Sequence, residues 1–274
     1  MPEGDTIFRS ARTLQRALAG QVILRFDTQL SQLAAIDRGA PIAGRTVLGA
    51  TARGKHLLLS LSGDLVLRTH MRMHGSWHLY RPGERWRAPR HEARVVVTTA
   101  TWIAIAFHVY DAEFLTAAGI DRHVRLAALG PDLLDEAFDV REARQRIKGV
   151  AARHVAEALL DQQAMAGLGN VFKSEVLFAC RISPFTAVSA LTDAQLDVLI
   201  TRARDLMRLN VAERSVALGA APGRVTTGRL NPSERLWVYS RAGAPCRVCG
   251  TPIESAGETD GRRTYWCPAC QPAT

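Results

Sequence analysis

Cys246-Arg247-Val248-Cys249 and, after seventeen further residues, Cys267-Pro268-Ala269-Cys270 determine the fold of the C-terminal end of this 274-residue chain. Two Cys-x2-Cys steps at this spacing are typical of a zinc ribbon, in which two hairpins supply four thiolates to one tetrahedral ion. Disulfides fit less well, because a fifth cysteine, Cys180, leaves an odd number and the N-terminus lacks the apolar segment of a signal peptide. We therefore expect one structural Zn²⁺ per chain and a reducing, cytoplasmic location, with Cys180 as a small buried hydrophobic residue.

The N-terminus offers a possible nucleophile. The chain opens Met1-Pro2-Glu3-Gly4-Asp5-Thr6, and removal of Met1 would leave the secondary amine of Pro2 beside the carboxylate of Glu3. An α-amino group has a pKa of about 8, so part of it is uncharged at neutral pH and can attack an electrophilic carbon. Glu3 is placed to move protons in that attack. Many chains begin Met-Pro without any such chemistry, so these residues gain meaning only from the rest of the chain.

The overall charge favours a polyanionic partner. Lys and Arg number 35 and Asp and Glu number 26, which gives a formal net charge of +9 and makes nucleic acid the common choice. Hydrophobic residues make up 47% of the chain, enough for a full core, yet no apolar run has membrane-spanning length. We expect no membrane association.

Residue periodicity predicts an N-terminal domain of one helix and two layers of strands. Residues 5–19 carry an apolar stripe at helical spacing, and Gly20 is a natural C-terminal stop. Short β-like runs follow; they cover residues 22–26, 46–50, 56–61, 65–70, 94–99 and 102–109. A helix packed with two sheets is a common way to bury such runs.

The second half of the chain is helical before the cysteines. Helices are expected over residues 139–147, 153–160 and 171–181, and Thr192-x-x-Gln195 is a capping box that opens a long helix. Residues 219–232 are rich in Gly, Pro and Thr and predict a loop. The fold class is therefore α+β, with domains at 1–122 (N-terminal helix and two-layer β-sandwich), 123–235 (helical) and 236–274 (zinc ribbon).

The segment Gly167-Leu168-Gly169-Asn170 lies between two expected helices. A glycine turn that leads into a helix points backbone N–H groups outward and can bind phosphate. An ordinary helix–turn–helix corner capped by Asn170 is the alternative.

Together, the Met-Pro-Glu-Gly start, the Gly-Leu-Gly-Asn corner and the four-cysteine ribbon resemble the formamidopyrimidine-DNA glycosylase and endonuclease VIII family, in order and over residues 2–271. The resemblance implies a helix–two-turn–helix middle domain. It also implies a bifunctional DNA glycosylase and abasic-site lyase of base excision repair, a monomer that acts on damaged double-stranded DNA.

The resemblance assigns the catalytic residues one by one. Pro2 would attack C1′ of the damaged nucleotide and form a Schiff base, and Glu3 would act as general acid and base. Lys55, within Arg53-Gly54-Lys55-His56-Leu57-Leu58, matches a lysine of the family that holds a phosphate and assists strand cleavage. A solvated lysine at a strand start is the alternative for Lys55.

On the C-terminal side, Arg262 stands five residues before Cys267, at the place of the family's essential arginine, which clamps phosphates. The adjacent Arg263 could be confused with it, although a surface charge on a hairpin is the preferred interpretation of Arg263. Asn170 would contact a phosphate beside the lesion, and Lys173 is grouped with it as a DNA contact.

Flipping a base out of the duplex leaves a hole that a side chain must fill. The family uses a short turn after a strand, which here corresponds to His70-Met71-Arg72-Met73-His74-Gly75. Met73 would be the apolar wedge, flanked by Arg72 and His74, with packing in the core as its alternative. His70 matches a phosphate contact of the family, and a buried, satisfied histidine is its alternative.

Two departures from the family pattern bear on the substrate. Thr6 replaces a glutamate found in many relatives, and Asp5 is a possible substitute. Residues 107–114 lack the Arg-Arg-Phe-Gly segment of the purine-preferring branch. This absence points to the endonuclease VIII branch and to oxidised pyrimidines, with cleavage by β,δ-elimination.

The alternatives are a glycosylase for 8-oxoguanine or formamidopyrimidines, a non-catalytic DNA-binding protein on the same scaffold, and a zinc-ribbon regulator. Residues 219–232 are a candidate lid over the flipped base.

Overall fold

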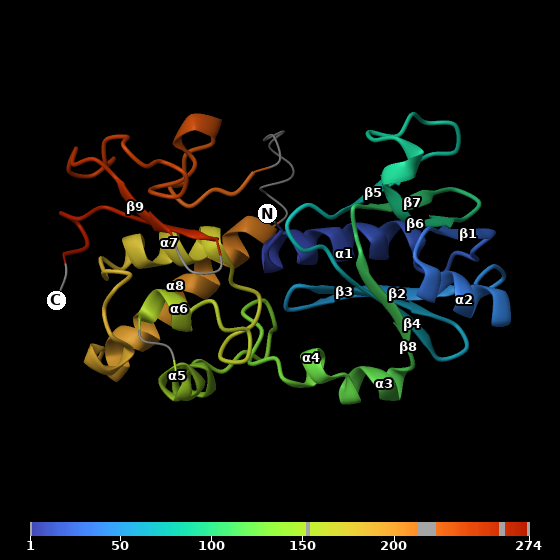
Figure 1. Cartoon of the computed structure of the whole chain (residues 1–274), viewed down its shortest axis with the longest axis horizontal. Helices are drawn as coiled ribbons and strands as arrows, with labels where there is room; N and C mark the ends of the chain where they lie inside the picture. The colour runs from blue at the N-terminus through green and yellow to red at the C-terminus, as the bar shows by residue number, and fades with distance from the viewer. Residues whose placement is uncertain (1, 152–153, 213–222, 258–260, 273–274) are drawn as a thin grey trace. The chain divides into compact units, whose positions relative to one another are not determined.

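The computed structural model describes residues 2–151, 154–212, 223–257 and 261–272, and the chain forms two compact units, Met1–Ala128 and Leu129–Thr274 (Figure 1). Each unit has a hydrophobic core of its own. Among the helices of these described ranges, none has both the length and the apolar character that a bilayer crossing requires.

Unit 1 is a sandwich of two four-stranded antiparallel sheets, with strand orders β1-β6-β7-β5 and β2-β3-β4-β8. The strands are β1 (Arg25–Thr28), β2 (Val47–Arg53), β3 (His56–Leu61), β4 (Leu65–His70), β5 (Ser76–Tyr80), β6 (Ala93–Thr98), β7 (Ile103–Phe107) and β8 (Asp111–Leu115). Alternate residues of both sheets, such as Leu57, Leu59, Val95 and Val97, are buried in one shared core. The predicted two-layer β-sandwich is confirmed.

Helix α1 (Gly4–Leu18) packs its apolar stripe into this core, as the residue periodicity predicts. The backbone carbonyl of Glu3, the residue just before the helix, accepts hydrogen bonds from Thr6 N at 2.9 Å and Ile7 N at 3.1 Å. Near the other end, Gln15 Oε1 accepts a hydrogen bond from Ala50 N at 2.6 Å and ties α1 to β2. The start of the chain is therefore anchored to the sandwich.

Several elements of unit 1 differ from the pattern predicted by the sequence. The expected strand at 22–26 is β1 (Arg25–Thr28), because its pairing with β6 begins at Arg25; Val22 forms an isolated bridge with Thr46. Elements that the pattern does not predict are α2 (Ser31–Gly39), η1 (Arg90–Glu92), β5, β8, α3 (Ala117–Arg122) and α4 (Val124–Ala127).

Unit 2 begins with a helical bundle. Its elements are α5 (Val140–Gly149), α6 (Val155–Ala158), α7 (Asn170–Ala179), η2 (Val188–Ala190), α8 (Asp193–Val211) and η3 (Pro232–Glu234). The capping box is present, since Thr192 Oγ1 accepts from Gln195 N and Gln195 Oε1 accepts from Thr192 N. The helix expected at 153–160 is the single turn α6. Cys180, half-buried against the bundle, has its pKa raised to about 11 by burial.

The zinc-ribbon region follows the bundle and rests on α7. Strands β9 (Glu254–Gly257) and β10 (Arg263–Trp266) form an antiparallel hairpin. Phe178 of α7 stacks on Trp237 with ring centroids 5.5 Å apart and joins Val238 and Ile253 in a small core. The predicted helical domain with a C-terminal four-cysteine ribbon is confirmed.

Candidate functional site

The start of α1 presents the predicted nucleophile and proton carrier. Pro2 is partly exposed, whereas the side chains of Glu3 and Asp5 are fully buried. Asp5 forms an ion pair with Arg9 at 3.4 Å and accepts a hydrogen bond from Thr6 Oγ1 at 3.3 Å. The threonine that replaces the family glutamate therefore contacts the neighbouring carboxylate.

The hairpin between β2 and β3 carries Lys55. Arg53 pairs with His56 across this hairpin, and Gly54 adopts a φ of +58°, which favours glycine. Lys55 is partly buried, and its charge is one of the influences that lower the pKa of His70. Lys55 and His70 therefore lie within electrostatic range of each other.

His70 and His56 face each other on paired strands, with ring centroids 4.9 Å apart. Burial, followed by nearby charges, lowers the pKa of His70 to about 4 and that of His56 to about 3. Arg72 N donates to His70 Nδ1 at 3.2 Å, so neutral His70 carries its proton on Nε2. The partly buried His70 thus keeps one ring N–H that can donate to a phosphate.

The turn after β4, residues 71–75, is called here the wedge turn. Met71 is 1% exposed and belongs to the core, whereas Met73 is 52% exposed, so core packing describes Met71 and not Met73. Arg72 and His74 are also exposed. Gly75 is required, because a Cβ there would lie 2.5 Å from the carbonyl oxygen of Met71.

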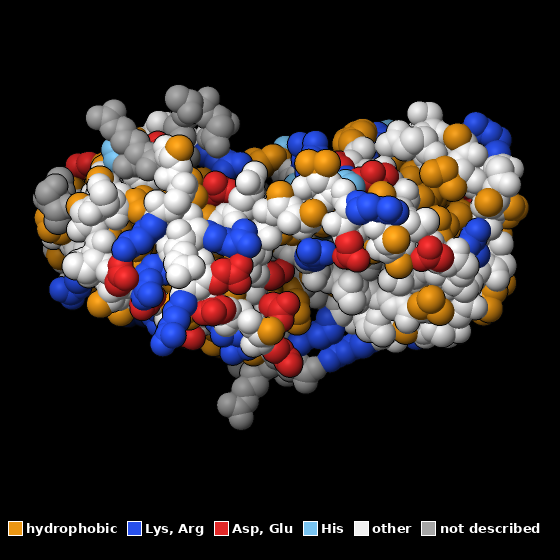
Figure 2. All heavy atoms as spheres, turned by 90° about the horizontal axis from the view of Figure 1, so that it is seen from below, with side chains coloured by type: hydrophobic (Ala, Val, Ile, Leu, Met, Phe, Trp, Pro, Cys, Tyr) orange, Lys and Arg blue, Asp and Glu red, His pale blue; other side chains and the backbone are white. Residues whose placement is uncertain are grey.

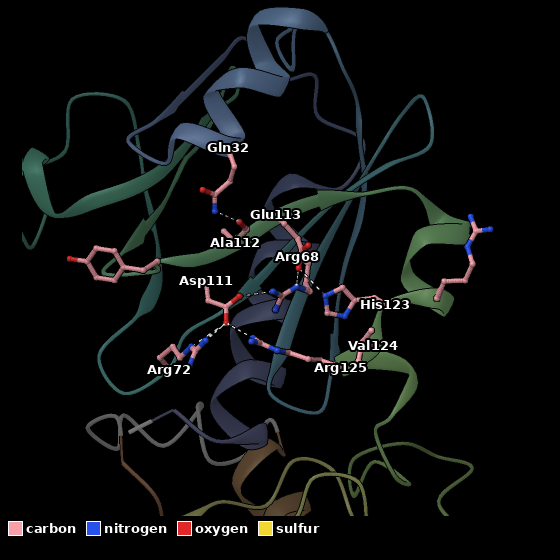
Figure 3. Close-up of a pocket in the computed structure, with 11 residues that line it drawn as sticks. Gln32, Arg68, Arg72, Asp111, Ala112, Glu113, His123, Val124 and Arg125 are labelled. Carbon is pink, nitrogen blue, oxygen red and sulfur yellow. Dashed lines mark hydrogen bonds and ion pairs between the residues drawn. The ribbon is translucent and has the colours of Figure 1, made fainter. Parts of the chain in front are cut away.

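A network of charged side chains lies beside the wedge turn (Figure 3). Arg68 is 3% exposed, and it donates to Asp111 Oδ1 at 2.5 Å, Glu113 Oε1 at 2.6 Å and His56 Nδ1 at 2.9 Å. His123 also donates to Glu113 at 3.0 Å. Arg68, Asp111, Glu113 and His123 border an open cavity of about 900 Å³ in unit 1.

The sequence analysis did not single out Arg68, Asp111 or Glu113. The available signal was an arginine within the apolar run Leu65-Val66-Leu67-Arg68, since a charge on a buried strand needs a carboxylate partner. Its partners are 43 and 45 residues away along the chain, so the run could not name them.

In unit 2, Asn170 is the first residue of α7 and is 4% exposed. Its Nδ2 donates to the carbonyl oxygen of Arg263 at 3.0 Å, while its Oδ1 has no hydrogen-bond partner among the described residues. Gly169 occupies the N-cap position, so Asn170 begins the helix and is not the cap that the alternative interpretation required. Asn170 instead joins the start of α7 to the hairpin that carries Arg262.

Lys173 lies one turn further along α7 and is fully buried. Its Nζ donates to Thr264 Oγ1 at 2.7 Å. Lys173 therefore contacts the hairpin strand β10 from within the protein, and its burial does not favour the predicted direct contact with DNA.

The two arginines of the ribbon hairpin have different surroundings. Arg263 is exposed and donates to Ser255 Oγ at 2.6 Å across the hairpin, as expected of a surface charge. Arg262 is partly buried and directly precedes β10. The structure brings Arg262, Asn170 and Lys173 to the same junction of α7 and β10.

The four cysteines can hold a metal ion. The sulfur atoms of Cys246, Cys249, Cys267 and Cys270 all lie within 4.8 Å of one another. Three of the Sγ–Sγ distances are 3.5, 3.5 and 3.9 Å. A tetrahedron with Zn–S bonds of about 2.3 Å has edges of about 3.8 Å, so the cluster fits zinc.

On the face that Figure 2 shows, acidic side chains stand among the Lys and Arg side chains. Ion pairs also join α5 to α8, such as Arg144 with Asp197 and Lys148 with Asp193. The candidate lid at 219–232 is described only from residue 223 onward; its first four residues lie outside the described part of the chain.

Comparison with known proteins covers the whole chain. Residues 1–110 match the formamidopyrimidine-DNA glycosylase N-terminal domain, residues 129–219 its H2TH domain, and residues 243–273 the zinc finger found in FPG and IleRS. A Streptomyces coelicolor protein named probable endonuclease 8 2 is 41% identical over 99% of this chain and 94% of its own. A Mycolicibacterium smegmatis protein named DNA-(apurinic or apyrimidinic site) lyase Nei2 is 38% identical over the full length of both.

Among solved structures, the complex of Lactococcus lactis Fpg with an abasic-site DNA superimposes with a TM-score of 0.82 at 23% identity, over 99% of this chain and 100% of that one. This likeness shows the shared fold. The full-length identities confirm the resemblance seen in the sequence: the chain belongs to the formamidopyrimidine-DNA glycosylase and endonuclease VIII family.

Proposed function

We propose that this chain is a base-excision-repair enzyme, a DNA glycosylase and abasic-site lyase, that removes oxidised pyrimidines from double-stranded DNA with Pro2 as nucleophile. The observation that carries the proposal is the anchored start of α1, where partly exposed Pro2 precedes the buried carboxylate of Glu3. Full-length relatives named as endonuclease 8 and as an abasic-site lyase support the same activity.

The proposed reaction begins when the Pro2 nitrogen, freed by removal of Met1, attacks C1′ of the damaged nucleotide. The C1′–N bond to the base breaks and the base leaves with a proton. The C1′–O4′ bond then breaks, and an iminium ion links Pro2 to the open sugar. Glu3 exchanges protons with the sugar oxygen as the ring opens. A neutral amine is needed for the attack, and the buried setting of Glu3 keeps the carboxylate close to the reacting atoms.

Strand cleavage follows from the iminium ion, which withdraws electrons from C2′. Loss of a C2′ proton expels the 3′-phosphate by β-elimination, and a second elimination expels the 5′-phosphate. Phosphates leave more readily beside cations and hydrogen-bond donors, and we assign this work to the cations Lys55 and Arg262 and to the Nε2–H of neutral His70. Asn170 contributes through the N-terminus of α7, where backbone N–H groups and the helix dipole favour an anion.

Met73 would fill the space left by the everted nucleotide, with Arg72 and His74 on either side. Zinc would be structural, because four thiolates leave no open position for water or substrate. The enzyme would act as a monomer on the chromosome in the cytoplasm.

The preference for pyrimidines is supported by the region that would hold extra wedge residues in the purine-preferring branch. Here residues 111–115 form β8, and Asp111 is held by Arg68 within the sandwich. Cleavage of matched duplexes with one oxidised pyrimidine or one 8-oxoguanine distinguishes the two substrate classes; faster cleavage of the 8-oxoguanine duplex would favour the purine alternative.

Borohydride trapping on a duplex with one abasic site tests the catalytic proposal. We expect a covalent adduct with the native chain, a much weaker one with Pro2→Gly, and none when extra residues precede Pro2. Glu3→Gln should still bind the duplex while it releases an intact lesion base slowly. Lack of an adduct from native protein with a full complement of zinc would instead support a non-catalytic DNA-binding protein.

A further inference from the structure

One carboxylate, that of Asp111, joins three guanidinium groups (Figure 3). Asp111 opens β8 directly opposite His70, and its side chain is 14% exposed. It accepts hydrogen bonds from Arg68 of β4, Arg72 of the wedge turn and Arg125 of α4. The network therefore connects the core of unit 1 to the turn predicted to enter DNA.

The two oxygens of Asp111 have different partners. Oδ1 faces inward and accepts from buried Arg68 at 2.5 Å. Oδ2 faces the cavity and accepts from Arg72 Nε at 3.1 Å and Nη2 at 2.7 Å, and from Arg125 Nη1 at 3.1 Å. Arg68 has Glu113 as a second carboxylate partner, whereas Asp111 is the carboxylate that Arg72 contacts.

Asp111 remains ionised under all ordinary conditions. Burial acts to raise its pKa, but the charges and hydrogen bonds of Arg68 and Arg72 outweigh burial and lower the pKa to about 2. The other charged or titratable groups near the carboxylate are Arg125, His70 opposite it, His56 and, further along β8, Glu113 with His123. The ion pair with Arg72 therefore persists at the pH of DNA repair.

The wedge turn needs such support, because Arg72 has a φ of +52°, a left-handed conformation that non-glycine residues rarely adopt. Two hydrogen bonds donated by backbone amides hold the turn: Arg72 N to the side-chain Nδ1 of His70 at 3.2 Å and Gly75 N to the carbonyl oxygen of Met71 at 2.8 Å. The Asp111–Arg72 ion pair is the third restraint on the turn. A single substitution at Asp111 can remove this ion pair.

We propose that Asp111 is a positioning residue that, through Arg72, holds the wedge turn with Met73 outward before DNA arrives. The inference rests on the proposed glycosylase function and adds a determinant of base eversion to it. A turn that is already ordered loses less conformational freedom when it enters the base stack, so binding and eversion are both favoured. Asp111 itself contacts neither the lesion nor the sugar.

A double-mutant cycle tests whether Asp111 acts through Arg72. Asp111→Asn keeps an oxygen for Arg68 and removes the charge that holds Arg72. We expect it to lower kcat/KM on a duplex with one oxidised pyrimidine by roughly tenfold, a coupling within the usual range for residues in direct contact. In an Arg72→Met background the same change should have an effect of less than about twofold.

The matched control is Arg122→Met, which removes a charge from the lining of the same cavity without touching Asp111 and should leave activity within about twofold of native.

A fluorescence readout separates positioning from stability. With 2-aminopurine opposite the lesion, stopped-flow fluorescence reports entry of the wedge turn, and we expect a slower rise with Asp111→Asn and with Arg72→Met but not with Arg122→Met. If Asp111→Asn gives no cooperative thermal transition, Arg72→Met, which changes an exposed side chain and also removes the ion pair, carries the test, and a fluorescence rise as fast as that of Arg122→Met would overturn the proposal.

Equal losses from Asp111→Asn in both backgrounds, or a loss no larger than that of Arg122→Met, would overturn the positioning role. The fluorescence signal needs no bond breaking. A native chain that fails to form a Schiff base would therefore contradict the proposed function and still allow the wedge-turn inference to be judged.

Discussion

At the scale of single residues, buried charges in this protein are matched by specific partners. Glu175 of α7 is fully buried, and its carboxylate accepts backbone hydrogen bonds from Trp237, Val238 and Tyr239 at 2.8–2.9 Å and a further one from Thr226 Oγ1. Burial raises the pKa of Glu175, while these donors favour the charged form. Since residues 237–239 lead into the zinc ribbon, Glu175 fixes the chain at the base of the ribbon.

Replacement of this carboxylate should destabilise unit 2. Glu175→Ala removes the carboxylate that accepts from three backbone N–H groups, and we expect a loss of about 3 kcal/mol in the free energy of unfolding, measured by urea denaturation. Glu254→Ala removes an exposed glutamate from β9 of the same ribbon and should change stability by less than about 0.5 kcal/mol. Equal stability of the two variants would show that the buried carboxylate does not anchor the ribbon.

At the scale of elements, local patterns in the sequence predict the parts whose causes are local. The stripe of α1, the capping box of α8 and the cysteine spacing depend on neighbouring residues, and the structure contains all three elements. Strands β5 and β8 were not predicted. Strand β8 reads Asp-Ala-Glu-Phe-Leu, and from the sequence alone Asp111 and Glu113 resemble solvent-exposed residues. In the structure both pair with Arg68, which lies on the neighbouring strand β4.

Lys173 illustrates the same limit within the candidate site. A lysine beside a phosphate-binding turn suggests a DNA contact, but most of α7 is apolar, and the structure buries residues 170–178. Asn170, Lys173 and Ser174 recur at i, i+3 and i+4, a spacing that is typical of a solvent-exposed helix face, so the burial of this face could not be predicted from the sequence. The partner of the lysine, Thr264, is 91 residues away and could not be identified from the sequence.

The approach of the connecting segment to the helix–two-turn–helix corner gives a prediction at this scale. A Cβ at Gly130 would lie 2.5 Å from the carbonyl oxygen of Gln163 and 2.6 Å from that of Ala164, just before the Gly167–Asn170 turn. Gly130→Ala should therefore shift this backbone, lower stability by about 1–3 kcal/mol and weaken binding to an abasic-site duplex.

The matched control for that substitution is Gly149→Ala. Gly149 ends α5, has no atom within 4 Å of its Cβ position and has no positive φ, so alanine there should be neutral or slightly stabilising. Thermal unfolding and fluorescence anisotropy of a labelled duplex measure both effects. A Gly130→Ala protein with the stability and affinity of Gly149→Ala would mean that the close approach is easily relieved.

At the scale of the whole molecule, the zinc-ribbon region differs from unit 1 in what stabilises it. Unit 1 has a large apolar core between two sheets. The zinc-ribbon region has a much smaller one, built around Phe178, Val238 and Ile253, and the strands of its hairpin are only four residues each. A short hairpin with so little apolar burial needs a further constraint, and four thiolates around one metal ion supply it.

Removal of the metal should therefore disorder the ribbon hairpin and leave the fold of unit 1 unchanged. With zinc chelated, we expect the hairpin to lose its order and Arg262, beside β10, to lose its position, so that affinity for an abasic-site duplex falls at least tenfold, or by about 1.4 kcal/mol. The thermal transition of unit 1 should not change, because its core shares no residue with the ribbon. Anisotropy titration with a labelled duplex measures the affinity, and added Zn²⁺ should restore it.

Cys180→Ser is the matched control, since Cys180 is outside the cluster and its loss should leave both zinc content and affinity intact. Full affinity in the metal-free protein would contradict the structural role of zinc and show that β10 is held by α7 alone, through Asn170 and Lys173.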